Sequence, residues 1–317
     1  MKQSIDLSNQ IKEIILSNGF NSVGISEADK LDDSTFLKKW ISSDFHADMA
    51  YMEDVEKRSD VRMINPKFKS VISCTLNYSS IDSKKLSIKA KRKGKGWISK
   101  YALGDDYHKV INKKLKQIQL RIEELYREKI NVKVYVDTGP ILERAYASKS
   151  GLGWIGKNSC LINKENGSWS FLSNILIDQE LVYDKPTLKN LCGSCTRCIN
   201  ACPTGAIVDD KVIDARKCIS YLTIENKKYI KKDLASKIRN NIFGCDICQE
   251  VCPWNHKNIP YTSEPDLQPS EWILNITKKD ALSWSDSEWK ENLNKSALKR
   301  IKPWMWRRNI NSISKNY

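Results

Sequence analysis

Eight of the ten cysteines in this 317-residue chain fall between Cys192 and Cys252, and they constrain the fold more than any other feature. The first four follow the spacing C-x2-C-x2-C-x3-C and precede Pro203. A separate Cys218 comes next, and a C-x2-C-x3-C run then precedes Pro253. Soft thiolates at this spacing are typical of 4Fe-4S clusters, because tight turns bring three sulfurs to one face.

The two cysteine runs complement each other, since in two-cluster bacterial ferredoxins the last cysteine of a run ligates the other cluster. The spacing therefore predicts a first 4Fe-4S cluster held by Cys192, Cys195, Cys198 and Cys252. It predicts a second 4Fe-4S cluster held by Cys202, Cys218, Cys245 and Cys248. Zinc ribbons also use C-x2-C pairs, but two long complementary runs favour iron–sulfur clusters over zinc.

The charge balance indicates a polyanionic partner. Lysine and arginine number 53 against 38 acidic residues, which gives a net charge of +15. A surface this basic attracts nucleic acid, although a high-pI protein without such a role is the open alternative. The N-terminal residues have no apolar signal region, and no apolar run approaches the length of a membrane helix, so we expect a cytoplasmic protein with no membrane association.

The first half of the chain alternates predicted strands and helices, which indicates a central sheet covered by helices, an α+β or α/β fold. Cys74 lies inside one apolar strand and is interpreted as a small buried hydrophobe. The predicted helices are 5–18, 105–129 and a segment from Ile141 onward, and the predicted strands are 21–25, 70–78 and 131–137.

Asp137 ends a predicted strand, where α/β folds place ligands, so it is a candidate general acid. The equally open alternative is that it caps the following turn or helix. Further on, Gly151, Gly153 and Gly156 spell G-x-G-x-x-G, but this loop follows a helix and lacks a ribose-binding acid, which disfavours a dinucleotide. A glycine-rich loop that approaches another large cofactor is the preferred interpretation. The three histidines receive no role.

Basic residues gather in segments 84–100 and 227–239 and in the C-terminal tail, where they alternate with tryptophans. Basic and aromatic residues together suit contacts with RNA backbone and bases. The alternatives are a solvated loop for the first segment and core tryptophans for the tail. The RNA-binding candidates are Lys91, Arg92, Lys93, Lys95, Lys231, Lys232, Arg307 and Arg308.

Several stretches together resemble the epoxyqueuosine reductase family, from near the N-terminus to about residue 310. The resemblance implies reduction of the epoxide of epoxyqueuosine at the tRNA wobble position, with cobalamin and two 4Fe-4S clusters as cofactors, fed by an external low-potential electron donor. The matching stretches are EKR (56–58), SKYALGDDYH (99–108), VDTGPILERAYA (136–147), GLGWIGKN (151–158) and the paired cysteine runs.

The same resemblance implies a domain order. Residues 1–185 would form a cobalamin-binding catalytic domain similar to that of reductive dehalogenases. Residues 186–262 would form a bacterial ferredoxin-like domain, and 263–317 a short helical tail. We expect a monomer, because one chain holds every part. Longer family members add a C-terminal helical-repeat extension that this chain largely lacks.

The resemblance also assigns residues. Asp137 matches the family's proton donor. Some members carry a cysteine near the cobalt where this chain has Ser99, so that cysteine is not essential here. The rival hypotheses are a corrinoid reductase of a small molecule and a non-catalytic electron-transfer protein. The candidate cobalamin contacts are Arg58, Ser99, Tyr101, Asp137, Trp154, Gly156, Lys157, Asn158 and Ser220.

Overall fold

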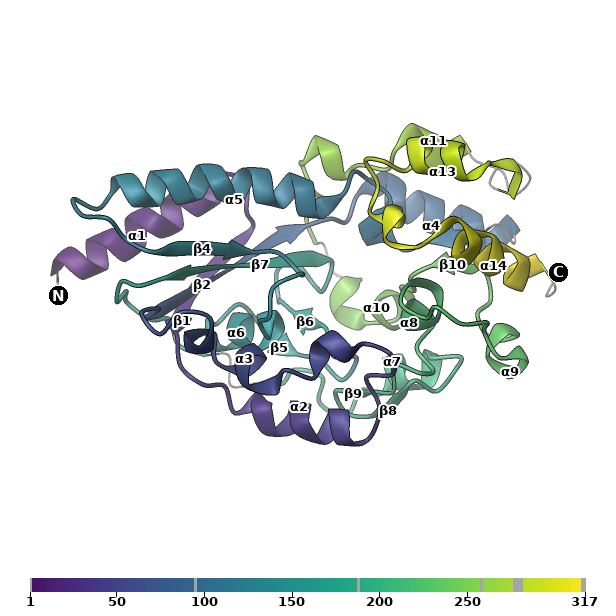
Figure 1. The fold of residues 1–317 in the computed structure, drawn as a ribbon, viewed down its shortest axis with the longest axis horizontal. Helices are drawn as coiled ribbons and strands as arrows, with labels where there is room; N and C mark the ends of the chain where they lie inside the picture. The colour runs from purple at the N-terminus through teal and green to yellow at the C-terminus, as the bar shows by residue number, and fades with distance from the viewer. Residues whose placement is uncertain (1, 94–95, 187–188, 257–258, 276–281, 315–317) are drawn as a thin grey trace.

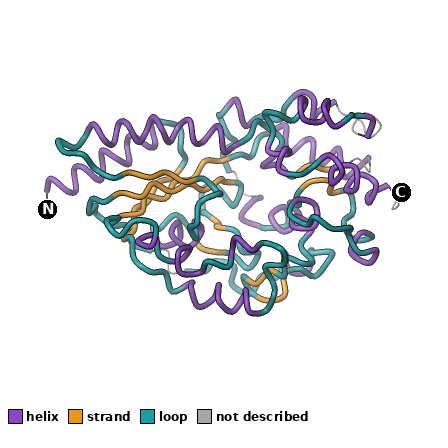
Figure 2. Tube along the Cα trace, viewed as in Figure 1, coloured by secondary structure: helices purple, strands orange, loops and turns teal. Residues whose placement is uncertain are grey.

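The computed structural model describes residues 2–93, 96–186, 189–256, 259–275 and 282–314. Its main feature is a four-stranded sheet in the order β1-β2-β7-β4, in which every neighbouring pair is antiparallel. The long strands gather in one half of the molecule, and short helices and loops dominate the other half (Figure 2). The strands of this sheet are β1 (Ser22–Glu27), β2 (Ser70–Asn77), β7 (Ser170–Ile177) and β4 (Val132–Tyr135).

Helices cover both faces of this sheet (Figure 1). The first face packs against α1 (Lys2–Ser17) and α5 (Tyr107–Glu124) through a large apolar core. The second face packs against α6 (Glu143–Lys149) and η2 (Val61–Met63) through a smaller one, and α3 (Val55–Ser59) directly precedes η2. Cys74 of β2 is fully buried in the large core, which confirms its interpretation as a buried hydrophobe.

The sequence predicted most of these elements. The helices at 5–18 and 105–129 are present as α1 and α5, and the three predicted strands are present as β1, β2 and β4. Because the sheet is antiparallel, the α+β class is the half of the predicted fold class that describes it; the fourth strand, β7, was not predicted. The ligand-site rule for parallel sheets therefore does not apply to Asp137, whose position depends on the local turn instead.

The cysteine-rich part joins the rest of the chain through a second, two-stranded sheet. In it β10 (Asn241–Phe243) pairs in parallel with β3 (Trp97–Ile98), and Asn241 lies opposite Trp97, which is 144 residues earlier in the chain. The other elements of this part are α7 (Arg197–Ala201), β8 (Ile207–Asp209), β9 (Val212–Ile213), α8 (Ile219–Ile224), α9 (Lys232–Ala235), α10 (Ile247–Glu250) and η4 (Pro253–Asn255).

The C-terminal residues pack onto both earlier parts. Trp289 and Trp306 are buried in the large core, which confirms the core interpretation for these two tryptophans, whereas Trp304 is exposed. The division at residues 185 and 262 stays a prediction, and residues from all three segments share that core. The tail contains η5 (Pro265–Leu267), α11 (Glu271–Asn275), α13 (Asp286–Asn292), η6 (Ala297–Arg300) and α14 (Pro303–Ser314).

The remaining elements are short connections and surface helices. Among the described residues, no helix has the length and apolar character needed to span a bilayer. These elements are α2 (Asp33–Ser42), η1 (Ala50–Met52), η2 (Val61–Met63), α4 (Ile81–Lys93), η3 (Lys100–Ala102), β5 (Trp154–Ile155) and β6 (Leu161–Ile162).

Candidate active site and iron–sulfur ligands

Asp137 lies in the turn between β4 and α6 with a left-handed backbone, φ +56°. This conformation is uncommon for a residue with a side chain, although aspartate tolerates it better than most. The turn is held by the Asp137 N–H, which donates to Glu143 Oε1 at 2.9 Å. The side chain of Asp137 is 61% exposed, so its carboxylate is accessible to a substrate.

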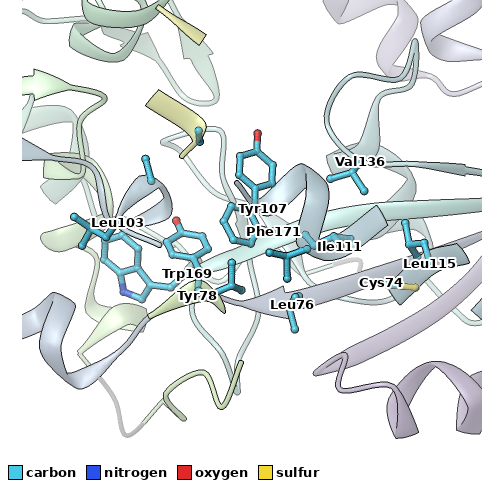
Figure 3. Close-up of a cluster of buried hydrophobic side chains, with 14 of the residues drawn as sticks. Cys74, Leu76, Tyr78, Leu103, Tyr107, Ile111, Leu115, Val136, Trp169 and Phe171 are labelled. Atoms are coloured by element: carbon cyan, nitrogen blue, oxygen red, sulfur yellow. The ribbon is translucent and has the colours of Figure 1, made fainter. Parts of the chain in front are cut away.

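The first turn of α5 presents two side chains to this carboxylate. The Tyr107 hydroxyl donates to Asp137 Oδ2 at 2.8 Å, and His108 Nε2 lies 3.3 Å from the same oxygen. The Tyr107 ring stacks on Phe171 of β7 and on the His108 ring, with centroids 4.3 and 4.0 Å apart. Figure 3 shows Tyr107 above this apolar cluster with its hydroxyl directed away from Phe171. The core thus fixes both groups that contact Asp137.

Asp106 holds the other side of the histidine ring. It is the N-cap of α5 and accepts the His108 backbone N–H at 3.1 Å. The same oxygen, Oδ1, lies 2.8 Å from His108 Nδ1. Its second oxygen accepts from Lys299 Nζ at 2.5 Å, so the C-terminal tail contributes to the group. Because Asp106 is buried, these bonds are shielded from water.

The pKa values of three ionisable groups at this site are shifted by their surroundings. Burial alone would lower the pKa of His108, but its bonds to Asp106 and Asp137 outweigh burial and raise that pKa to about 9. The hydrogen bond from His108, with that from Tyr107, lowers the pKa of Asp137. Burial, with the charge of Asp137 nearby, raises the pKa of Glu143 to about 8. At neutral pH the site holds an imidazolium beside an Asp137 carboxylate.

Two predicted cobalamin contacts lie close enough to Asp137 to interact with it electrostatically. Burial raises the pKa of Tyr101, and the charge of Asp137 adds to this shift. Burial lowers the pKa of Arg58, and the negative charge of Asp137 acts in the opposite direction and raises it. The Tyr101 ring also meets the edge of Tyr107 at 5.9 Å. The structure therefore brings Arg58, Tyr101 and Asp137 together.

Other predicted cobalamin contacts lie toward the cysteine-rich part. The Ser99 hydroxyl donates to Asp246 at 2.5 Å, and Asp246 lies in the sequence between Cys245 and Cys248. Asn158 Nδ2 donates to the Cys248 carbonyl at 3.4 Å. Lys157 pairs with Asp210 at 3.2 Å.

Ser220 is half-buried in α8, and its backbone N–H contacts the Cys218 thiol. No contact in the described residues joins it to Asp137. Its assignment to cobalamin stays a prediction, as do those of Ser99, Lys157 and Asn158.

Two glycines of the glycine-rich loop are required by close contacts within the loop itself. A Cβ on Gly153 would lie 2.2 Å from the Ile162 carbonyl oxygen, and one on Gly156 would lie 2.5 Å from the Ile162 side chain. Gly153 also has φ +155°, within the region that favours glycine. The glycines therefore let the β5–β6 hairpin close tightly on its own chain, which explains them without a cofactor.

The cysteines gather in two groups. The pKa of the Cys198 thiol is raised by burial and by the neighbouring Cys192 and Cys252 thiols. Burial, with the Cys218 and Cys202 thiols nearby, likewise raises the pKa of Cys245. These neighbours match the two crossed ligand sets, whose assignment stays a prediction.

The first group includes a polar atom that suits a sulfur acceptor. Trp154 packs with Cys192 and Cys252, and its indole N–H is buried with no partner in the described part of the chain. A sulfide or thiolate at this place would accept that N–H. Within the described residues, no three His, Cys, Asp or Glu side chains converge on the position of a single metal ion.

Cys160 received no role from the sequence, and the structure gives it a neighbour. Its thiol hydrogen-bonds the Cys248 thiol, a predicted ligand of the second cluster. The sequence signal that could have indicated this contact is its position two residues after Asn158, inside the stretch that packs against Cys248.

The structure corrects one RNA-binding candidate and weakens another. Arg308 is 9% exposed and donates to the backbone oxygens of Asn226 and Leu222, so it cannot reach a phosphate. Arg307 pairs with Asp286 at 2.7 Å. Lys231 and Lys232 are exposed and stay candidates. Lys95 lies outside the described residues, as do the side chains of Lys91, Arg92 and Lys93.

Comparisons with known proteins agree with this arrangement. Residues 191–255 match the family of 4Fe-4S double cluster binding domains, which makes the chain an iron–sulfur protein of the two-cluster class. Residues 58–138, which include Arg58, Tyr101 and Asp137, match the family described as epoxyqueuosine reductase QueG. An epoxyqueuosine reductase of Prochlorococcus marinus is 45% identical over 99% of both chains. The chain belongs to the epoxyqueuosine reductase family.

Solved structures of the same family share the fold. An epoxyqueuosine reductase bound to an epoxyqueuosine-modified tRNA-Tyr stem loop superposes with a TM-score of 0.85, at 28% identity over 99% of this chain and 82% of that one. An epoxyqueuosine reductase from Bacillus subtilis, whose aspartate-bearing catalytic loop is swung out of the active site, superposes with a TM-score of 0.84. The sequence identity is 26% over 99% of this chain and 82% of that one.

Proposed function

We propose that this protein reduces epoxyqueuosine in tRNA to queuosine, using cobalamin and electrons that pass through two 4Fe-4S clusters. The observation that carries the proposal is the accessible Asp137 carboxylate, held by Tyr107 and His108 in the segment that matches the family. The relative bound to a modified tRNA stem loop supports tRNA as the substrate. The basic net charge of +15 agrees with that substrate.

The residues around Asp137 suit a corrinoid. The Arg58 guanidinium offers donors for the amide oxygens at a corrin's edge, and the Tyr101 ring, packed on Tyr107, offers a flat apolar surface. When bound there, cobalamin would supply low-potential electrons to the substrate. The protein's own part is to bind and orient the base and to hold a proton at Asp137.

The overall reaction defines what Asp137 must do. Conversion of an epoxide to an alkene takes up two electrons and two protons and releases one water. We propose that the electrons come from an external low-potential donor. Asp137 would protonate the oxygen as its carbon–oxygen bonds break, a role worth about 10²–10⁴-fold in rate. We further propose that the protein acts as a cytoplasmic monomer.

The test is Asp137→Asn, assayed by nucleoside analysis of epoxyqueuosine-containing tRNA under anaerobic, reducing conditions. We expect turnover to fall at least 10²-fold, with both clusters and bound cobalamin unchanged in the visible spectrum. Asp44→Asn is the matched control, because Asp44 is another exposed aspartate with a left-handed backbone, φ +55°. Normal turnover in Asp137→Asn would refute the assignment.

The same preparation separates the two rival functions. A corrinoid reductase of a small molecule would bind cobalamin and leave the tRNA nucleoside unchanged. A simple electron-transfer protein would contain clusters and bind no corrinoid.

A further inference from the structure

A line of hydrogen-bonded ionisable groups runs from the C-terminal tail to Asp137. Lys299 Nζ contacts Asp106 Oδ2, Asp106 Oδ1 contacts His108 Nδ1, and His108 Nε2 contacts Asp137 Oδ2. The three distances are 2.5, 2.8 and 3.3 Å. Three separate segments contribute to this line, namely η6, the start of α5 and the turn after β4.

This arrangement presents a chemical difficulty for Asp137 as a proton donor. Its carboxyl is stabilised as an anion by His108 and Tyr107, so at neutral pH it carries no proton to give. The proton must therefore reach Asp137 during the reaction, either from solvent or from a group in contact with its carboxylate. The His108 ring nitrogen is in contact with the carboxylate oxygen itself.

We propose that His108 stores the proton that Asp137 delivers to the substrate oxygen, and that Asp106, anchored by Lys299, positions the ring for this transfer. The inference rests on the proposed function and deepens it. It assigns a role to a histidine, a buried aspartate and a tail lysine. The ring lies between two carboxylates, which favour its protonated form. The raised pKa of His108 is consistent with this position.

The other groups near Asp137 are less suited to store this proton. Burial raises the pKa of Tyr107 far above the neutral range, so its hydroxyl holds the carboxylate and keeps its own proton. Glu143 contacts the backbone N–H of Asp137 and not its carboxylate. The positive charge of Arg300 acts on Asp137 from the tail and favours its anionic form.

The transfer balances as follows. The His108 Nε2–H proton moves to Asp137 Oδ2, and Asp137 then passes that proton to the epoxide oxygen, so that the ring is neutral and Asp137 is again a carboxylate. Solvent protonates the ring once more, and the same path delivers the second proton as the oxygen leaves as water. The two electrons come from the external donor through the clusters and enter the substrate carbons.

The charged groups that face the ring set its pH dependence. Asp106, Asp137 and Glu143 are negative or become negative as pH rises, and each favours the imidazolium. Lys299 and Arg300 oppose them from the tail. Because the pKa of His108 is raised to about 9, the stored proton is present below that pH and is lost above it.

The decisive experiment is the pH dependence of single-turnover reduction of epoxyqueuosine tRNA by the holoenzyme. We expect the wild-type rate to fall above about pH 9. We call this fall the alkaline limb of the pH profile. In His108→Gln we expect the alkaline limb to move several pH units toward acid. The rate should fall by about 10²-fold or more at pH 8 and by a smaller factor near pH 6. A purely structural role would lower the rate equally at all pH values and would overturn the proposal.

Glu143→Gln is the matched control, because glutamine keeps the acceptor for the Asp137 N–H and removes the other carboxyl with a raised pKa. We expect its alkaline limb to move toward acid by far less than in His108→Gln, because only one of the three carboxyls that favour the imidazolium is removed. A limb that shifts in Glu143→Gln and not in His108→Gln would assign the stored proton to Glu143 and overturn the proposal.

A second measurement does not depend on turnover. The chain has only three histidines, His46, His108 and His256, so imidazole resonances in histidine-labelled protein can be assigned by substitution. We expect the His108 ring to titrate near pH 9 and its pKa to fall in Asp106→Asn, which keeps an N-cap side chain but removes the charge. A ring that titrates at about 6.5 would overturn the proposal.

The two proposals fail in distinguishable ways. If wild-type protein leaves epoxyqueuosine unchanged, the proposed function is wrong, whatever His108 does. If wild-type protein reduces it and His108→Gln keeps the alkaline limb, only the proton store is wrong.

Discussion

Removal of the Asp246 side chain should lower the stability of the protein, because this side chain joins the cysteine-rich part to the rest of the molecule. Asp246 is 1% exposed and lies between Cys245 and Cys248. Its carboxylate accepts from Trp97 Nε1 at 2.9 Å, the Ser99 hydroxyl at 2.5 Å and the Lys100 N–H at 2.9 Å. One side chain therefore holds the whole segment that enters η3 beside the loop of the second predicted cluster.

The magnitude follows from what Asp246→Ala leaves behind. The indole N–H and the Lys100 N–H cannot rotate to water, and each buried unpaired donor costs about 1–3 kcal/mol. Loss of the charged hydrogen-bond acceptor adds to this free-energy cost. Removal of a charge that is buried in the wild-type protein reduces the cost. We expect a net loss of about 3–5 kcal/mol, as for other broken buried charge networks. For 317 residues, with an unfolding entropy of about 2.1 cal/mol/K per residue, that corresponds to a fall of about 5–8 °C in apparent Tm.

The assay is anaerobic calorimetry combined with iron and sulfide analysis of the purified protein. Asp246→Ala should melt earlier and lose iron from the second cluster, because the loop that carries Cys245 and Cys248 is no longer anchored. Asp233→Ala in α9 is the control, since Asp233 is an exposed aspartate. A shift in Asp246→Ala no larger than that of Asp233→Ala would refute the reasoning.

Three further predictions concern the clusters and the RNA surface. Cys252→Ser and Cys248→Ser should each lose about half of the bound iron but from different clusters, so their reduced electron paramagnetic resonance spectra should differ; identical spectra would contradict crossed ligation. Trp154→Phe should lower the reduction potential of the first cluster, because it removes an N–H donor to sulfur, and an unchanged potential would show that the indole points elsewhere. Lys231→Gln with Lys232→Gln should weaken tRNA binding and reduce its log–log salt slope by about 1–2, whereas an unchanged slope would exclude α9 from the RNA surface.

Much of the fold was predictable because its signals are local. The apolar period of α5 and the β-branched run of β2 define these elements without reference to anything distant. The strand β7 was missed because its sequence, SFLSNILI, mixes serine and asparagine with apolar residues. Burying a polar side chain is costly unless it gains a hydrogen bond, and Asn174 gains one by donating to Ser73 of β2, a partner that only the folded sheet supplies.

The RNA candidates show where composition misleads. Arg308 sits in a basic and aromatic tail that resembles an RNA-binding segment, yet the tail folds back onto α8. Burial lowers the pKa of Arg308 to about 10, and its donors bind backbone oxygens inside the protein. A charge count cannot distinguish a phosphate contact from an internal structural arginine.

The sequence by itself predicted which cysteines hold iron and, through the stretches that resemble a known family, which aspartate acts as an acid. Cysteine spacing suffices for the first, because three ligands of a cluster lie within one short segment. The Thr-Gly-Pro run directly after Asp137 predicts that this residue ends its strand at a turn. Only the tertiary structure decided how that aspartate obtains a proton. His108 precedes it by 29 residues and Lys299 follows it by 162, and electrostatic contact between them exists only after the sheet, α5 and the tail pack together.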